Sequence, residues 1–262
     1  MRPIVFCTDY GLGDEFVGVC HGVMQRIAPG VRVIDLTHAI GRQDVLQGAL
    51  VLGRAAAYMP DDAVYVAVVD PGVGSDRAEI AVETGSGALL VGPDNGLLSM
   101  AWAALGGPAR AVSIASEGVL LQPVSKTFHG RDIFAPAAAH LAAGMRLDEL
   151  GPPLEVGELE TLELPGPMVA PGKIGARVMG VDGFGNVQLN LGAAEIEHAG
   201  LGDLLLVAGR PAPLVAVFSD VPEQAMAAII DSQGFLAVVV NQGSAASLLG
   251  LRPGATVVVE AG

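Results

Sequence analysis

Residues 2–37 read RPIVFCTDYGLGDEFVGVCHGVMQRIAPGVRVIDLT, and no other stretch of the chain carries a clearer structural signal. Short apolar, β-prone runs at its two ends, residues 2–8 and 31–37, predict strands. Between them, residues 13–29 place apolar side chains at helical spacing, namely Phe16, Val17, Cys20, Val23, Met24 and Ile27. A strand, a helix and a second strand in this order predict a βαβ unit with parallel strands.

The same alternation continues outward from this unit. Residues 44–58 predict a second helix, and residues 63–69 predict a third strand. Later expected elements are strands at 78–83, 88–92 and about 110–114, a short helix after Asn95-Gly96, and a helix from Asp132 as its N-cap to about Ala143, with Gly144 as its C-cap. Alternating strands and helices predict an α/β domain, a Rossmann-like sheet with helices on both faces.

A proline-rich segment divides the chain. Residues 151–172 hold five prolines with little periodicity, which predicts a linker. Beyond it, short β-prone runs are punctuated by Gly or Asp, at 173–181, 187–191, 203–208, 213–218, 227–231, 235–240 and 255–260, with one brief helix near 244–249. We therefore expect an α/β domain over residues 1–165 and a smaller all-β barrel over residues 166–262.

Composition excludes several classes of protein. Fourteen Lys and Arg stand against 28 Asp and Glu, and the formal charge of −14 opposes an extended phosphate backbone, so we expect no nucleic-acid partner. No apolar run reaches the roughly 18–20 residues of a membrane span, and the N-terminus lacks the apolar region of a signal peptide, so we expect a cytoplasmic protein without membrane contact. Cys7 and Cys20 have no CxxC or Cys/His spacing, so both are predicted to be reduced core residues.

One motif imitates a dinucleotide-binding fingerprint. Gly11 and Gly13 follow the first strand, and Asp35 ends the second. The third glycine of that fingerprint is absent, because Phe16 stands where close helix packing needs it, so we interpret the glycines as a tight turn. HExxH, P-loop and GxSxG motifs and carboxylate clusters with metal spacing are also absent, which removes the usual support for metal-dependent, nucleotide or esterase hydrolysis.

Three loops bring polar groups to the expected sheet. Asp9 follows the first strand, Asp70 and Arg77 bound the glycine-rich loop after the third, and His129 immediately precedes a helix. Each has a simple structural interpretation, as a helix cap, an exposed ion pair or a structural histidine. Because the carboxyl ends of parallel strands meet at one sheet edge, the three loops together predict a site that positions water.

The C-terminal part contributes turns with recognisable binding chemistry. In Asp182-Gly-Phe-Gly-Asn186, the Phe184 ring could stack on a base while Asn186 hydrogen-bonds its edge, although the segment is also an ordinary β-turn. Ser232-Gln-Gly234 and Asn241-Gln-Gly-Ser244 are turn sequences by default.

Taken in order, these motifs resemble the S-adenosylmethionine hydroxide adenosyltransferase family, the hydrolase relatives of fluorinase and chlorinase. The motifs are Thr8-Asp9, Asp70-Pro-Gly-Val-Gly74 with Arg77, Pro93 with Asn95-Gly-Leu-Leu98, Thr127-Phe-His-Gly-Arg-Asp132, and Asp182-Gly-Phe-Gly-Asn186. They extend over nearly the whole chain. In that family an Asp, Arg and His triad marks the members that use water, and it falls on Asp70, Arg77 and His129.

The resemblance implies hydrolysis of S-adenosyl-L-methionine to adenosine and L-methionine, without a metal or organic cofactor. It assigns Asp9 to the ribose hydroxyls, Asn186 and the backbone near Val240 to adenine, Phe184 to stacking, and Asp182 with Ser232 to the methionine end. It also implies a homotrimer, with each site between the N-terminal domain of one subunit and the C-terminal domain of the next.

Departures from the halogenases bear on the reaction. Asp70 stands where fluorinase has a tyrosine, and Gly130 where it has a halide-binding serine, so we expect no halide pocket. Gln188 and Gln233 replace a tryptophan and an arginine, which leaves recognition of the methionine carboxylate open. Two alternatives remain: an S-adenosylmethionine-dependent halogenase, and a non-catalytic adenosine-binding module.

Overall fold

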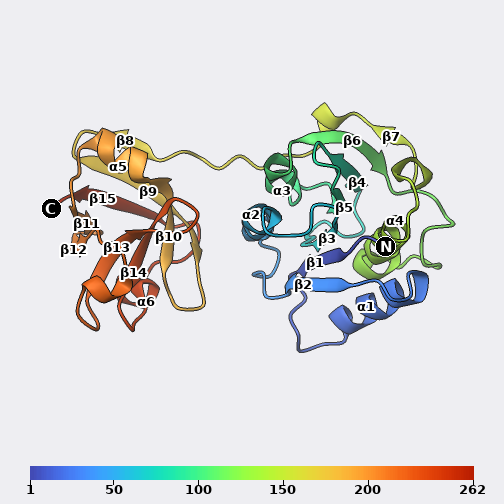
Figure 1. Ribbon diagram of the computed structural model, residues 1–262, viewed down its shortest axis with the longest axis horizontal. Helices are drawn as coiled ribbons and strands as arrows, with labels where there is room; N and C mark the ends of the chain where they lie inside the picture. Colours follow the sequence, from blue (N-terminus) through green and yellow to red (C-terminus); the bar gives the residue numbers. More distant parts are fainter. The chain divides into compact units, whose positions relative to one another are not determined.

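The computed structural model describes residues 1–262, which separate into two compact units, Met1–Leu162 and Glu163–Gly262 (Figure 1). Each unit is built around its own sheet. The contacts divide the chain between residues 162 and 163, whereas the sequence predicts a boundary between 165 and 166. None of the helices is both long and apolar enough to cross a membrane.

The N-terminal unit is built on a seven-stranded mixed sheet. Its strands are β1 (Ile4–Thr8), β2 (Val33–Thr37), β3 (Val64–Val68), β4 (Glu79–Thr84), β5 (Leu89–Pro93), β6 (Pro108–Ser113) and β7 (Pro153–Leu154), in the spatial order β2-β1-β3-β5-β4-β6-β7. The first four in that order are parallel, as the βαβ pattern predicts. The β4 strand runs antiparallel to both β5 and β6.

Helices cover both faces of this sheet. The helices α1 (Phe16–Ile27) and α4 (Ala135–Ala142) pack on one face, and α2 (Val45–Ala56) and α3 (Ser99–Ala104) pack on the other. Side chains of a strand alternate between faces, so Ile4 and Phe6 join the α1 and α4 core while Val5 and Cys7 join the opposite one. Burial on both faces explains why the β1 sequence is continuously apolar.

Both cysteines lie in these cores, as the sequence predicts. Burial raises the pKa of the Cys7 thiol to about 12, with the nearby Asp9 carboxylate adding to the effect. Burial likewise raises the pKa of the Cys20 thiol to about 12. Because only a thiolate is a strong nucleophile, neither cysteine is suited to catalysis at neutral pH.

Two expectations for the N-terminal unit are wrong. Asp132 caps no helix: residues Gly130–Phe134 form a π-helical turn, η1, that runs directly into α4, and Asp132 is buried inside it. Its carboxylate accepts hydrogen bonds from the Ser125 N–H (2.9 Å) and the Arg131 side chain. The first part of the expected linker also belongs to the N-terminal unit, because it forms β7 and buries Leu159 in the core.

The C-terminal unit is a barrel-like sheet of eight strands with two short helices. Its elements are β8 (Met168–Ala170), β9 (Lys173–Val181), β10 (Val187–Gly192), α5 (Ala193–Ala199), β11 (Leu204–Val207), β12 (Arg210–Pro213), β13 (Met226–Ile230), β14 (Phe235–Val240), α6 (Ala245–Leu249) and β15 (Thr256–Ala261). The spatial order is β12-β11-β15-β9-β10-β14-β13, with β8 beside β9. A bridge from Leu214 to Ala228 brings the two outer strands together, so the barrel is nearly closed.

The C-terminal unit also corrects two expectations. The α5 helix was not predicted: it starts where Glu195 accepts a hydrogen bond from the Gly192 N–H (2.8 Å) and ends at Gly200, with φ at 66°. The strand expected at 213–218 lies earlier in the chain: β12 ends at Pro213, and a 3₁₀ turn follows at Phe218–Asp220.

Gly53 in α2 provides a test of how closely α2 packs on α3, and Gly22 in α1 is the control. A Cβ added to Gly53 would lie 2.9 Å from Met100 Cβ and 3.2 Å from the Met100 carbonyl, whereas one added to the exposed Gly22 would meet nothing within 4 Å. We expect Gly53→Ala to lower the free energy of unfolding by about 1–3 kcal/mol. Gly22→Ala should raise it by about 0.5–1 kcal/mol, because alanine favours the helix. Urea denaturation measures both, and an unchanged midpoint for Gly53→Ala would contradict the close α2–α3 contact.

Candidate active site

A small pocket opens at one edge of the N-terminal sheet. The strands β1 and β3 end at this edge, and β4 begins there because it runs antiparallel to β5. The pocket has a volume of about 140 Å³, and Asp9, Tyr10, Asp70, His129 and Gly130 contribute to its lining. The structure thus brings three of the predicted polar residues to one cavity.

Arg77 and Asp70 form a buried ion pair behind the pocket. Arg77 Nε donates to Asp70 Oδ1 (2.9 Å), and Arg77 Nη2 donates to Asp70 Oδ2, which makes the pair bidentate. The Arg77 side chain is 9% exposed and that of Asp70 is 5% exposed, so this is not the exposed hairpin pair that the sequence also allows. The guanidinium lies 5.4 Å from the centre of the buried Phe134 ring, which further fixes its position.

His129 joins this pair through Arg77 and an additional carboxylate. His129 Nδ1 lies 3.0 Å from Arg77 Nη2 and 3.1 Å from Glu79 Oε1, and Arg77 Nη1 donates to the same Glu79 oxygen (2.9 Å). Arg77 Nη2 can only donate and so uses the Nδ1 lone pair, whereas Glu79 Oε1 can only accept and requires a proton on Nδ1, so the two contacts favour opposite tautomers of the imidazole. In the tautomer that Glu79 favours, His129 Nε2 carries the lone pair, and His129 lines the pocket.

Glu79 is not among the site residues that the sequence predicts. The sequence signal for Glu79 is weak: it is the first residue of β4, and Arg77 lies two residues before it in the segment that leads into the strand. Side chains at such positions of a strand point to the same side. A strand that brings Arg77 to the pocket therefore brings Glu79 with it.

Asp9 anchors a neighbouring loop instead of a helix. Its Oδ2 accepts a hydrogen bond from the Gln43 N–H (2.9 Å), and α1 begins after Glu15 without a side-chain cap. Asp9 Oδ1 has no hydrogen-bond partner within the protein, so a carboxylate oxygen is available to a hydroxyl donor at the pocket.

Tyr10 fills the space beside Gly130. A Cβ placed on Gly130 would overlap the Tyr10 hydroxyl oxygen. Burial raises the pKa of Tyr10 well above its usual value, so the phenol stays protonated. The pocket therefore cannot accommodate a serine at position 130 with Tyr10 in this place.

In the C-terminal unit, the loop between β9 and β10 is organised by Asp182. Asp182 Oδ1 accepts hydrogen bonds from the backbone N–H groups of Phe184 and Asn186, both at 2.9 Å, and its Oδ2 accepts from Asn186 Nδ2 (2.8 Å). Holding the Asn186 amide nitrogen leaves its Oδ1 as an acceptor for a ligand. The Phe184 ring is 83% exposed, which is unusual for a large apolar side chain.

Phe184, Asn186 and Val240 line one pocket of about 540 Å³ within the C-terminal unit. The structure does not bring Ser232 into it, because Ser232 lies in the turn before β14 and Val240 ends that strand. Gln188 donates to Asp231, next to Ser232. Both carboxylate oxygens of Asp182 accept hydrogen bonds within the loop, so Asp182 affects the pocket by fixing the position of Asn186.

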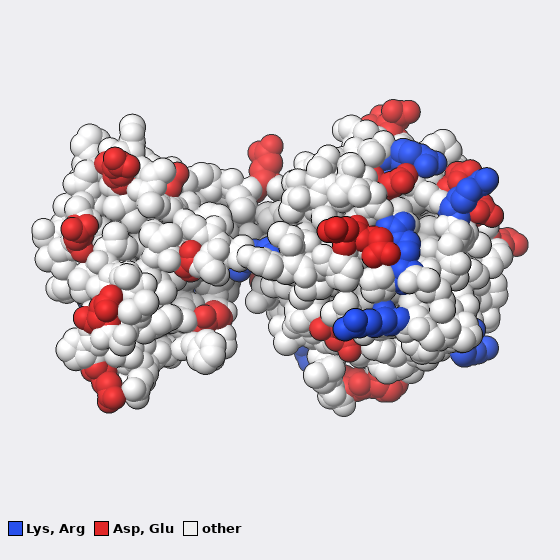
Figure 2. Space-filling model, viewed as in Figure 1, with Lys and Arg blue, Asp and Glu red and all other residues white.

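The charge distribution agrees with the acidic composition. On the face drawn in Figure 2, acidic side chains are scattered over the C-terminal unit, and the basic side chains of the N-terminal unit lie among acidic ones.

This protein belongs to the S-adenosylmethionine hydroxide adenosyltransferase family. The model of the SAM hydroxide adenosyltransferase N-terminal domain matches residues 4–151, and that of the C-terminal domain matches residues 176–258. The predicted family membership is thereby confirmed.

Individual relatives support the assignment over the full length. A protein from Salinispora arenicola named (R)-S-adenosyl-L-methionine hydrolase is 50% identical, with the alignment covering 99% of this chain and 98% of that protein. A fluorinase from an Actinoplanes species is 30% identical, covering 98% and 97% of the two chains. The crystal structure of an uncharacterized conserved protein from Thermotoga maritima superposes with a TM-score of 0.89 at 36% identity, covering 98% of this chain and 99% of that one.

The contact between Gly130 and Tyr10 gives a direct test of the pocket. Gly130→Ser should force Tyr10 out of its place and lower the free energy of unfolding by about 1–3 kcal/mol. Gly118→Ser is the matched control, because a Cβ there meets nothing within 4 Å, and it should change stability by less than about 0.5 kcal/mol. Urea denaturation gives both values, and equal stability of the two variants would show that Tyr10 does not close the pocket.

Proposed function

We propose that this protein hydrolyses S-adenosyl-L-methionine to adenosine and L-methionine. The observation that carries the proposal is the buried group of Asp70, Arg77 and His129 at a pocket large enough for only a few small groups. The greater similarity to a named hydrolase than to a fluorinase supports water as the nucleophile. The clash of a Gly130 side chain with Tyr10 argues in the same direction, since it disfavours a halide-binding serine.

The substrate needs little help with its leaving group. The sulfonium already activates C5′ of the ribose, so when water oxygen bonds to C5′ the C–S bond breaks and its electron pair stays on sulfur. Methionine leaves as a neutral thioether, and the water gives up one proton. The enzyme must therefore orient a water molecule in line with the C5′–S bond and accept the proton that the water releases.

We assign these tasks to the N-terminal group. Asp70 and His129 hold the water, and His129 Nε2 accepts its proton. Arg77 fixes Asp70 through two hydrogen bonds and stabilises the negative charge that develops on the water oxygen. Glu79 is a positioning residue: it accepts a hydrogen bond from His129 Nδ1–H, which opposes the Arg77 donor at the same nitrogen and leaves the Nε2 lone pair free.

The remaining residues are assigned to substrate binding. Asp9 Oδ1 accepts a hydrogen bond from a ribose hydroxyl, Phe184 stacks on adenine, and Asn186 Oδ1 accepts from its exocyclic amino group. The backbone near Val240 completes the adenine site. Asp182 and Ser232 are the proposed residues for the methionine end of the substrate. Asp182 would act through the loop that it organises.

The division of these residues between the two units supports a site that both units share. We propose a homotrimer in which the N-terminal unit of one subunit and the C-terminal unit of the next supply each site. We also propose that the N-terminal unit is Rossmann-like. In this proposal it binds the nucleoside at the carboxyl ends of its parallel strands, as open α/β sheets do. A reaction without a metal or organic cofactor and a cytoplasmic location stay predictions.

A chromatographic assay tests the function. Purified protein incubated with S-adenosyl-L-methionine of each sulfonium configuration should release adenosine and methionine in equal amounts. Formation of 5′-halo-5′-deoxyadenosine in chloride or fluoride would favour the halogenase alternative. Adenosine binding without any turnover would favour a non-catalytic module.

Kinetics of single replacements should separate chemistry from binding. We expect Arg77→Ala and His129→Ala to lower kcat by roughly 10² or more, with smaller changes in KM. Asn186→Ala should mainly raise KM. The Arg77/His129 double replacement should cost much less than the product of the single effects, because residues that act on one water fail together. Near-normal kcat in folded single variants would refute the triad assignment.

Replacement of Glu79 should alter the protonation of His129 without altering binding. In Glu79→Gln the amide no longer demands the Nδ1 proton, and the tautomer with a protonated Nε2 becomes favoured. We expect kcat to fall roughly tenfold to a hundredfold, with KM and adenosine affinity within twofold of the wild type. Calorimetry with adenosine and steady-state kinetics measure the split, and equal loss of both parameters would indicate a merely structural role.

Mixed oligomers test whether a site is shared between subunits. His129→Ala damages the N-terminal half of a site, and the double replacement of Phe184 and Asn186 by Ala damages the C-terminal half. If each site joins two subunits of a ring, an equal mixture after dissociation and reassembly should regain about one quarter of the wild-type activity. Activity no higher than the mean of the two variants would show that each subunit builds its own site.

A further inference from the structure

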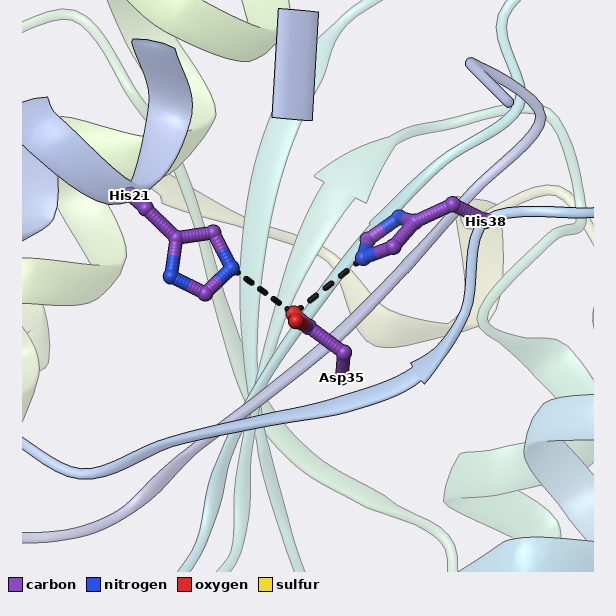
Figure 3. A group of neighbouring side chains, drawn as sticks. All are labelled: His21, Asp35 and His38. Atoms are coloured by element: carbon purple, nitrogen blue, oxygen red, sulfur yellow. Dashed lines mark hydrogen bonds and ion pairs between the residues drawn. The ribbon is translucent and has the colours of Figure 1, made fainter. Parts of the chain in front are cut away.

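Outside the catalytic group, two histidines converge on one carboxylate at the β2 edge of the N-terminal unit. His21 comes from α1, Asp35 from β2 and His38 from the loop that follows β2 (Figure 3). His21 Nε2 lies 2.8 Å from Asp35 Oδ1, and His38 Nε2 lies 3.1 Å from the same oxygen. One ligand-type atom from each residue lies within 4.8 Å of the other two.

One nitrogen of this group, His38 Nε2, has no hydrogen-bond partner within the protein. His38 is 5% exposed, and its buried Nε2 is close enough to Asp35 for an ion pair but forms no well-aligned hydrogen bond. A buried polar nitrogen without such a bond is unfavourable, so a ligand that uses its lone pair stabilises the fold. We propose that His21, Asp35 and His38 bind a divalent transition-metal ion of the zinc class.

The surroundings hold His38 in the orientation that this role requires. Thr8 Oγ1, fully buried, lies 2.9 Å from His38 Nδ1, so the imidazole can donate from Nδ1 and direct the Nε2 lone pair to a metal. The Phe6 ring packs edge-on against His38, with centroids 4.8 Å apart, and also contacts His21. Both rings therefore have restricted freedom before any ion binds.

The donor set selects the kind of ion. Two imidazole nitrogens and one carboxylate oxygen suit Zn²⁺, Co²⁺ or Ni²⁺, whereas Mg²⁺ and Ca²⁺ prefer oxygen ligands throughout. Ligand atoms of a tetrahedral zinc lie about 3.3 Å apart, so the 2.8 and 3.1 Å separations need only small side-chain rotations. Solvent reaches the site, because the side chains of Asp35 and His21 are 45% and 31% exposed.

A metal at this position stabilises the loop that holds the nucleoside end of the catalytic pocket. The His38 carbonyl accepts a hydrogen bond from the Gly11 N–H (2.7 Å), and Thr8 Oγ1 also accepts from the Tyr10 N–H (3.2 Å). The ion would thus join β2 to the segment that carries Asp9 and Tyr10. Its role is structural, and the proposal is independent of the reaction.

Zinc binding to the full-length protein tests the site. Protein freed of metal with a chelator is titrated with ZnCl₂ by calorimetry and by melting temperature, and Co²⁺ replaces zinc to record its visible spectrum. We expect one Zn²⁺ per chain, a rise in melting temperature of about 5–10 °C at 100 times Kd, and a Co²⁺ spectrum typical of tetrahedral nitrogen and oxygen ligands.

Three variants identify the ligands. His21→Ala and Asp35→Asn remove partly exposed groups, so both should fold, as circular dichroism can verify, and both should weaken zinc binding at least about tenfold. His198→Ala, an exposed histidine in the C-terminal unit, should bind zinc like the wild type. Absence of binding below roughly 1 mM Zn²⁺, or binding that His21→Ala and Asp35→Asn leave unchanged, would overturn the proposal.

Discussion

The buried charge of Arg77 is the constraint on which the site depends. A guanidinium that is 9% exposed is stable only when carboxylates and hydrogen-bond acceptors surround it. Asp70 and Glu79 supply the charge, and the Phe134 ring covers one side. Because the five guanidinium donors are rigid and planar, these contacts also fix where Asp70 and His129 can lie.

The sheet topology makes this arrangement possible. Three parallel strands, β1, β3 and β5, end at one edge, which is where open α/β sheets bind ligands. The β4 strand runs in the opposite direction, so its first residue, Glu79, and Arg77 just before it lie at the same edge. A fully parallel sheet would place the start of β4 at the far edge, away from Asp70.

The space beside Gly130 is the other feature that shapes the site. Tyr10 packs against Gly130, and the pocket between Asp70 and His129 holds about 140 Å³. Gly130 carries no side chain, so no hydroxyl group is present at that position to bind a halide. The exposed Phe184 and the acceptor of Asn186, in the other unit, offer the flat and polar contacts that a purine needs.

The sequence by itself determined the βαβ start, most strands and the two-unit organisation, because hydrophobic periodicity and turn residues are local properties. The order of its motifs also identified the family, through a resemblance. It also marked Asp70, Arg77 and His129 in advance. Only the tertiary structure decided that Arg77 is buried, that Glu79 joins it, that Asp132 lies inside a π-helical turn, and that His21, Asp35 and His38 meet. Each of these depends on contacts between residues distant in the chain or on a turn whose geometry follows from core packing, and neither leaves a periodic pattern in the sequence.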